Sequence, residues 1–153
     1  MSETQGASPR RRSYANRWKH AALVQGGYLV VPTAFLQHYA RLKPYPLTSG
    51  EALFVLHLME FKWDEDAPFP GYKTLAARMG ISDKMARRHA QSLETKGYLR
   101  RVIRTGQTNR FDLTPLFDLL QKVHAEDVAR KGRARRPRRD PEAAEEPAAE
   151  DVI

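Results

Sequence analysis

The chain has 153 residues, of which 41% are hydrophobic, and its formal net charge is +8. It contains no cysteine, which excludes disulfides, thiolate zinc sites and cysteine nucleophiles. No run of 18 apolar residues occurs and residues 1–12 hold no apolar stretch, so we expect neither a membrane span nor a secretory signal. The hydrophobic content suffices for one modest core, and the positive charge favours a polyanionic partner, most commonly nucleic acid.

The basic residues gather in three segments. The first is the N-terminal segment, where they interleave with aromatic residues: Arg10, Arg11, Arg12, Arg17 and Lys19. The second, residues 73–110, holds ten basic residues against only Asp83 and Glu94. The third begins at Arg130 and is followed by an acidic end rich in Ala, Pro and Glu. We therefore expect three regions: a flexible basic arm over 1–22, a folded domain over 23–129, and a disordered basic-then-acidic tail over 130–153.

The first two elements predicted along the chain are a short strand and a helix. Residues 28–31 follow a pair of glycines and are rich in β-forming side chains, which predicts a short strand that ends at Pro32. Apolar residues then recur at helical spacing over residues 33–42, with Thr33 as the candidate cap and two prolines downstream as the terminator.

A second helix follows these prolines. Thr48 and Glu51 have the spacing of a capping box, and the apolar stretch after them predicts a buried helix over residues 49–62. Residues 63–72 contain prolines and a run of acidic residues, which predicts a loop.

The most informative segment starts with residues 72–82, which begin with a short predicted helix. Its apolar side chains are Leu75, Ala76 and Met79. Gly80 can take the left-handed conformation that ends this helix. Ile81 would then fill the interior of a tight turn, and Ser82 is a suitable N-cap for a second helix over residues 83–96.

The second helix and the segment after it complete the pattern. The inward-facing residues of the helix are expected to be Ala86, Ala90 and Leu93. Gly97 would end the helix, and residues 98–104 and 109–113 would then form a hairpin. Thr114 and Pro115 would start a final helix that reaches about residue 129.

These elements, in this order, resemble the winged helix-turn-helix family of bacterial, phage and plasmid DNA-binding proteins, over residues 47–120. The matching positions in the helices and turn are Thr74, Leu75, Ala76, Gly80, Ile81, Ser82, Ala86 and Leu93. Residues 96–99 resemble the start of the family's wing, and residues 108–116 resemble the closing strand of replication-initiator and phage regulatory members. Many members carry larger aliphatic residues at the positions of Ala86 and Ala90. The resemblance implies a mostly α-helical fold with a small β-hairpin wing (α+β).

In this fold the second helix enters the major groove, where its polar face meets base edges. The residues expected to read bases are Asp83, Lys84, Arg87, Arg88 and Gln91. The residues expected to contact the DNA backbone or minor groove are Lys73, Thr74, Ser82, Arg100, Arg101, Arg104, Gln107 and Arg110. Which wing arginines face DNA depends on the strand register, which the sequence leaves open.

Other chemistry finds little support in the sequence. The histidines show no paired ligand spacing, and His57, inside an apolar helix, is expected to be a core residue rather than a ligand or a base. The acidic residues 64–66 lack the glycine and distal glutamate of a calcium loop. No glycine-rich phosphate loop or nucleophile elbow occurs. We therefore expect no enzymatic activity, cofactor, metal or small-molecule ligand.

Three functions stay open. The first is a sequence-specific double-stranded DNA-binding transcriptional regulator of the repressor type, cytoplasmic and associated with the nucleoid. The second, favoured by the closing strand of the wing, is a plasmid or phage replication-initiation or segregation factor. The third is a winged-helix adaptor that contacts proteins. Because two half-sites supply more contacts than one, we also expect a homodimer to which the final helix contributes.

Overall fold

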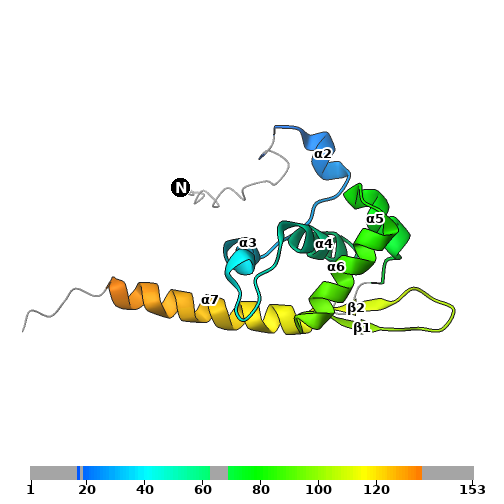
Figure 1. Cartoon of the computed structure of the whole chain (residues 1–153). Coiled ribbons are helices and arrows are strands. Elements are labelled where there is room, and N and C mark those ends of the chain that lie inside the picture. The colour runs from blue at the N-terminus through cyan, green and yellow to red at the C-terminus, as the bar shows by residue number, and fades with distance from the viewer. Residues whose placement is uncertain (1–16, 18, 63–68, 136–153) are drawn as a thin grey trace, which may run out of the picture.

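The computed structural model describes residue 17, residues 19–62 and residues 69–135. Its elements in chain order are α2 (Ala21–Gln25), α3 (Thr33–His38), the 3-10 helix η1 (Tyr39–Arg41), α4 (Ser49–Glu60), α5 (Tyr72–Met79), α6 (Asp83–Thr95), β1 (Arg100–Val102), β2 (Arg110–Asp112) and α7 (Thr114–Ala134) (Figure 1). This arrangement confirms the predicted class, a mostly helical fold with one small β-hairpin. Most of the predicted basic arm, the acidic loop residues 63–68 and the tail from residue 136 lie outside the described residues.

Helices α4, α5 and α6 pack against one another and form the body of the domain (Figure 1). The predicted capping box starts α4: Thr48 Oγ1 accepts a hydrogen bond from the Glu51 amide at 3.1 Å, and Glu51 Oε1 accepts one from the Thr48 amide at 3.3 Å. The helix ends at Glu60, slightly before the predicted end at residue 62.

The core around this body also draws on α3, β2 and α7. Its largest fully buried side chains are Phe35, Phe54, Phe111, Leu42, Leu58, Leu75, Leu93, Leu116 and Val55. The rings of Phe54 on α4 and Phe111 on β2 meet edge to face with their centroids 6.3 Å apart. This geometry is favourable for aromatic pairs, and it fixes the base of the hairpin on α4.

The hairpin is shorter than predicted. Strands β1 and β2 pair antiparallel, with Arg101 opposite Phe111. Tyr98 and Leu99, which were expected to begin the first strand, are 4% and 3% exposed and belong to the core before β1 starts. These two residues pack into the core instead of pairing with the second strand, so β1 starts only at Arg100.

Helix α7 follows the hairpin directly and packs on α3. Its buried side chains are Leu116 and Leu120. The helix continues past residue 129 to Ala134, and its C-terminal part extends beyond α3 (Figure 1). None of the helices in the described part of the chain is long and apolar enough to cross a membrane.

The predicted strand over residues 28–31 is wrong. This segment has no regular structure, and Tyr28 and Val30 are 66% and 71% exposed. A strand needs a neighbour to pair its amides and carbonyls, and the sheet in the described residues consists of β1 and β2 alone. The predicted cap of the next helix also shifts: Thr33 is the first residue of α3, Pro32 holds the cap position, and no side chain caps the helix.

Candidate nucleic-acid interface

The turn between α5 and α6 has the geometry that its sequence predicts. Gly80 has φ +67°, in the left-handed region, and the amide of Ile81 donates to the Ala76 carbonyl at 3.0 Å. Ser82 then caps α6, because its hydroxyl accepts a hydrogen bond from the Met85 amide at 3.1 Å. These contacts set the angle between the two helices locally, within four residues of the turn.

Helix α6 buries one face and exposes the other. Ala86, Ala90 and Leu93 are all 0% exposed, as predicted, and their side chains pack toward α4 and α5. The small alanines permit close approach between helices, which accounts for their presence where larger aliphatic residues are common. The predicted base-reading residues are all exposed: Asp83, Lys84, Arg87, Arg88 and Gln91. By helical spacing Thr95 lies on the same exposed face as Lys84, Arg88 and Gln91, and it was not predicted from the sequence as a contact residue.

One flank of α6 is organised around Tyr72, the first residue of α5. The Arg87 guanidinium lies over the Tyr72 ring, 4.7 Å from its centroid. Such stacking holds the arginine at a defined place beside the helix while its charge stays exposed. The Tyr72 ring in turn packs edge to face against Phe111, with centroids 5.7 Å apart, so this flank connects to the hairpin.

The strand register settles which wing arginines point outward. Arg101 lies opposite Phe111 on the inward face, whereas Arg100 and Arg110 lie on the other face. Arg101 Nε lies 3.2 Å from Glu94 Oε1, and its Nη1 donates to the Tyr72 hydroxyl at 3.0 Å. The hydrogen bond to Tyr72 and the nearby Glu94 carboxylate raise the pKa of Arg101 above its ordinary value. Arg101, which the sequence predicted as a DNA contact, therefore has its partners inside the protein.

The end of the wing is tied to the segment before α5. Arg104 Nε donates to the Thr108 carbonyl at 2.9 Å, and its guanidinium lies 5.3 Å from the centroid of the Phe69 ring. Thr108 Oγ1 donates to the Phe69 carbonyl at 2.6 Å. Gln107 and Arg110 are exposed, as are the three predicted contacts at the helix starts: Lys73, Thr74 and Ser82.

Pairing reduces the positive charge that residues 73–110 can offer to a ligand. In the described part of the chain, four of the basic residues lie near a carboxylate: Arg78 with Glu60, Lys96 with Glu51, Arg100 with Asp112, and Arg101 with Glu94. Six have no such ion pair among the described residues: Lys73, Lys84, Arg87, Arg88, Arg104 and Arg110. These six belong to α5, the outer face of α6 and the wing.

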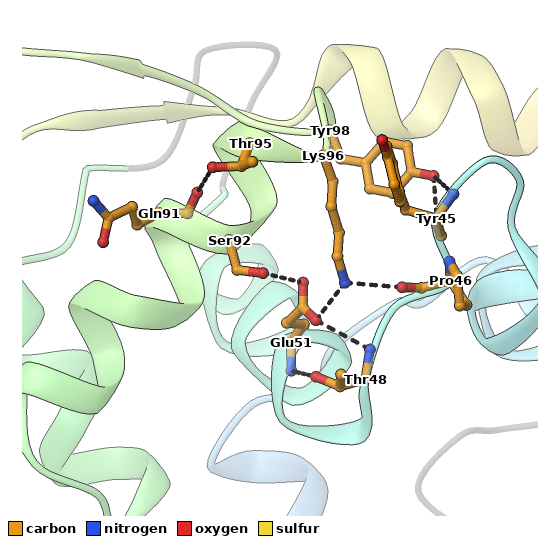
Figure 2. A network of polar contacts seen from close by, with 9 residues as sticks. All are labelled: Tyr45, Pro46, Thr48, Glu51, Gln91, Ser92, Thr95, Lys96 and Tyr98. Atoms are coloured by element: carbon orange, nitrogen blue, oxygen red, sulfur yellow. Dashed lines mark hydrogen bonds and ion pairs between the residues drawn. The ribbon is translucent and has the colours of Figure 1, made fainter.

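A buried polar network anchors the C-terminal end of α6 to α4 (Figure 2). Glu51 is 2% exposed, and its carboxylate accepts hydrogen bonds from Lys96 Nζ at 2.7 Å and from the Ser92 hydroxyl at 3.3 Å. Burial favours a raised pKa for Glu51, but the hydrogen bonds from Lys96 and Thr48 outweigh it and hold the pKa below its ordinary value of 4.5. The capping box was visible in the sequence, whereas Lys96 lies 45 residues away and had no local signal.

The histidines form no metal site in the part of the chain that the structure describes. His57 is half-buried, and its Nδ1 lies 3.6 Å from a Glu60 oxygen. The rings of His38 and His124 meet edge to face with centroids 6.1 Å apart. These contacts place His38, His57 and His124 in packing and surface roles.

Residues 45–99, which cover α4 to α6 and end just before β1, match a family model described as a helix-turn-helix domain. This segment is a helix-turn-helix domain. Because β1 and β2 follow the domain directly, it is of the winged type that the sequence resembles. The match runs from Tyr45, before α4, to Leu99, so it contains the whole outer face of α6, while the wing arginines from Arg100 lie just outside it.

Two solved structures show a partial similarity. One is the transcriptional regulator PA3341, with 23% identity over 57% of this chain and 62% of that chain and a TM-score of 0.36. The other is the YusO protein from Bacillus subtilis, with 24% identity over 57% of this chain and 60% of that chain and a TM-score of 0.37. This chain spans less than two thirds of either protein, and neither similarity is close enough to identify a function. No curated protein sequence matches the chain.

Proposed function

We propose that this protein is a sequence-specific double-stranded DNA-binding protein, a transcriptional regulator of the repressor type. The observation that carries the proposal is the outer face of α6, where Lys84, Arg88 and Gln91 are exposed and have no ion-pair or hydrogen-bond partner for their side chains among the described residues. A polar helix face of this kind, next to a wing and braced by α5, is suited to the major groove.

Base reading is assigned to the exposed residues of α6. Arg87 and Arg88 can each donate two hydrogen bonds to guanine O6 and N7, and Gln91 can pair with adenine N6 and N7. Asp83, at the start of the helix, can accept from cytosine N4, and Lys84 can donate to guanine. A good bidentate contact discriminates against a wrong base by about 1–3 kcal/mol.

Backbone contacts are assigned to the positions around this helix. The proposed phosphate or minor-groove contacts are Lys73, Thr74, Ser82, Arg100, Arg104, Gln107 and Arg110. We assign Arg101 a different task, because its bonds to Glu94 and Tyr72 hold β1 against α5 and α6. Losing a phosphate contact weakens binding to all sequences and lowers its salt dependence, which distinguishes these residues from the base readers.

A selection from a random duplex library tests this proposal with the full chain. We expect enrichment of one short site, palindromic if the protein binds as the proposed homodimer. Sites upstream of genes would support a transcriptional regulator, and repeated sites at an origin would instead assign the chain to replication or segregation. Absence of binding to any duplex at low salt would refute DNA binding as the function.

An adaptor that binds proteins is the second candidate, and one observation favours it. A concavity of about 970 Å³ lies between residues 26–32 and α4, and its walls are mostly apolar. Leu53 on α4 and Val30 opposite it are 44% and 71% exposed, which is unusual for large apolar residues that line one hollow. Recovery of one stoichiometric protein partner and no enriched DNA would establish this function instead.

A further inference from the structure

A second concavity lies along the C-terminal half of α6, on the flank that faces away from the wing. It has a volume of about 450 Å³ and is lined by Tyr45, Arg88, Gln91, Ser92, Thr95 and Lys96. The two flanks of the helix are distinct, since Arg87 and Glu94 contact Tyr72 and Arg101 on the wing side. Ser92 and Lys96 instead contact Glu51 of α4 on the opposite side. We call this second concavity the Tyr45 groove.

The wall of the groove that carries Tyr45 is fixed to the end of α6 (Figure 2). The Tyr98 hydroxyl donates to the Tyr45 carbonyl at 2.5 Å and accepts from the Tyr45 amide at 3.3 Å. Lys96 Nζ donates to the Pro46 carbonyl at 2.9 Å. Three hydrogen bonds thus hold the backbone of residues 45 and 46 beside the helix, so the Tyr45 side chain starts from a defined position.

The side chain of Tyr45 itself has no such partner. It is 51% exposed, and its hydroxyl makes no hydrogen bond to any residue that the structure describes. None of the residues that line the groove is acidic, and the buried Glu51 carboxylate, which contacts the lining residues Ser92 and Lys96, is neutralised by Lys96 at 2.7 Å. The groove therefore offers a free hydroxyl donor and the Arg88 cation, with no uncompensated carboxylate to repel an anion.

A helix in the major groove lies between the two phosphate backbones of the duplex, so groups on both of its flanks meet phosphates. The wing supplies donors on one flank, and Tyr45 is an exposed donor on the other. We propose that the Tyr45 hydroxyl binds a backbone phosphate of the DNA strand opposite the wing, beside the bases that Arg88 and Gln91 read. This inference rests on the proposed function and adds to it a second boundary of the DNA interface.

The test is the affinity of Tyr45→Phe for the selected site and for a scrambled duplex. Tyr45→Phe removes only the hydroxyl, and because this group has no partner inside the described protein the melting temperature should not change. We expect both affinities to fall by about 10- to 150-fold, because the lost hydrogen bond is to a charged phosphate. The salt slope should stay unchanged, because tyrosine is neutral.

Tyr28→Phe is the matched control, since Tyr28 is 66% exposed and lies on the other concavity. This control should bind both duplexes as the unaltered protein does. Phosphate ethylation interference gives an independent readout, in which one position on the strand opposite the wing should lose its effect in Tyr45→Phe. If the unaltered protein binds its site and Tyr45→Phe binds equally well with the same interference pattern, the inference is overturned while DNA binding stands. If the unaltered protein binds no duplex, the proposed function itself falls.

Discussion

Replacing Glu51 by alanine should destabilise the domain far more than replacing Glu60, another glutamate of the same helix. The Glu51 side chain is 3% exposed and accepts a charge-assisted hydrogen bond from Lys96, whose side chain is 19% exposed. Removing one partner of a buried ion pair costs about 3–5 kcal/mol when the other is left without compensation. Lys96 keeps its bond to the Pro46 carbonyl, so we expect a loss of about 2–4 kcal/mol.

The Glu60 pair sets the scale for comparison. Glu60 pairs with Arg78, but their side chains are 38% and 48% exposed, and exposed ion pairs contribute about 0–1 kcal/mol. Urea unfolding followed by circular dichroism measures both variants under the same conditions. In thermal unfolding, Glu51→Ala should lower Tm by about 10–20 °C in a domain of this size. Equal losses for the two variants would show that the Glu51 network does not hold α6 to α4.

Three further predictions concern the turn, the wing and pH. Gly80→Ala should lower the free energy of unfolding by about 1 kcal/mol, because Gly80 has φ +67°. Gly132→Ala, in the last turns of α7, should raise it by up to about 1 kcal/mol, because alanine favours a helix over glycine. A change of the same sign in both variants would refute the left-handed role of Gly80. In urea unfolding, Arg101→Met should lower the free energy of unfolding by about 1–2 kcal/mol, because Arg101 loses its bond to Tyr72. The Arg100 side chain is 68% exposed, so Arg100→Met should lower it by less than about 0.5 kcal/mol. A larger loss for Arg100→Met would contradict the inward position of Arg101. Because the pKa of Glu51 is lower in the folded protein than its ordinary value of 4.5, the ionised carboxylate stabilises the fold above pH 4.5. This contribution is lost as the pH falls through the pKa of Glu51 in the folded protein. The free energy of unfolding should therefore decline less steeply below pH 4.5 in Glu51→Gln than in the unaltered protein.

The elements that sequence alone predicts well are those whose signals are local. Gly80 and Ser82 determine the turn and the start of α6 through contacts within a few residues, and Thr48 does the same for α4. The inward face of α6 followed from helical spacing alone. In each case the deciding interaction lies inside one or two helical turns, so a pattern in the sequence is sufficient to identify it.

The predictions that failed or stayed incomplete depend on distant partners. Residues 28–31 have β-forming side chains but no neighbouring strand in the described residues, so their preference for extended structure does not produce a strand. The position of Arg101 depends on the register of the hairpin and on Tyr72, 29 residues earlier, which no local pattern reveals. Tyr45 entered no prediction because its place beside α6 is created by Tyr98, 53 residues further along the chain.

The most direct test of DNA reading by α6 is the ratio of affinities for the selected site and for a scrambled duplex, measured by fluorescence anisotropy. Arg88→Ala should lower this ratio by about 5- to 150-fold, because a bidentate base contact discriminates by about 1–3 kcal/mol. Arg110→Ala, on the exposed face of the wing, should weaken both affinities equally and leave the ratio unchanged. An unchanged ratio in Arg88→Ala, together with a lowered ratio in Arg110→Ala, would contradict the assignment of base reading to α6.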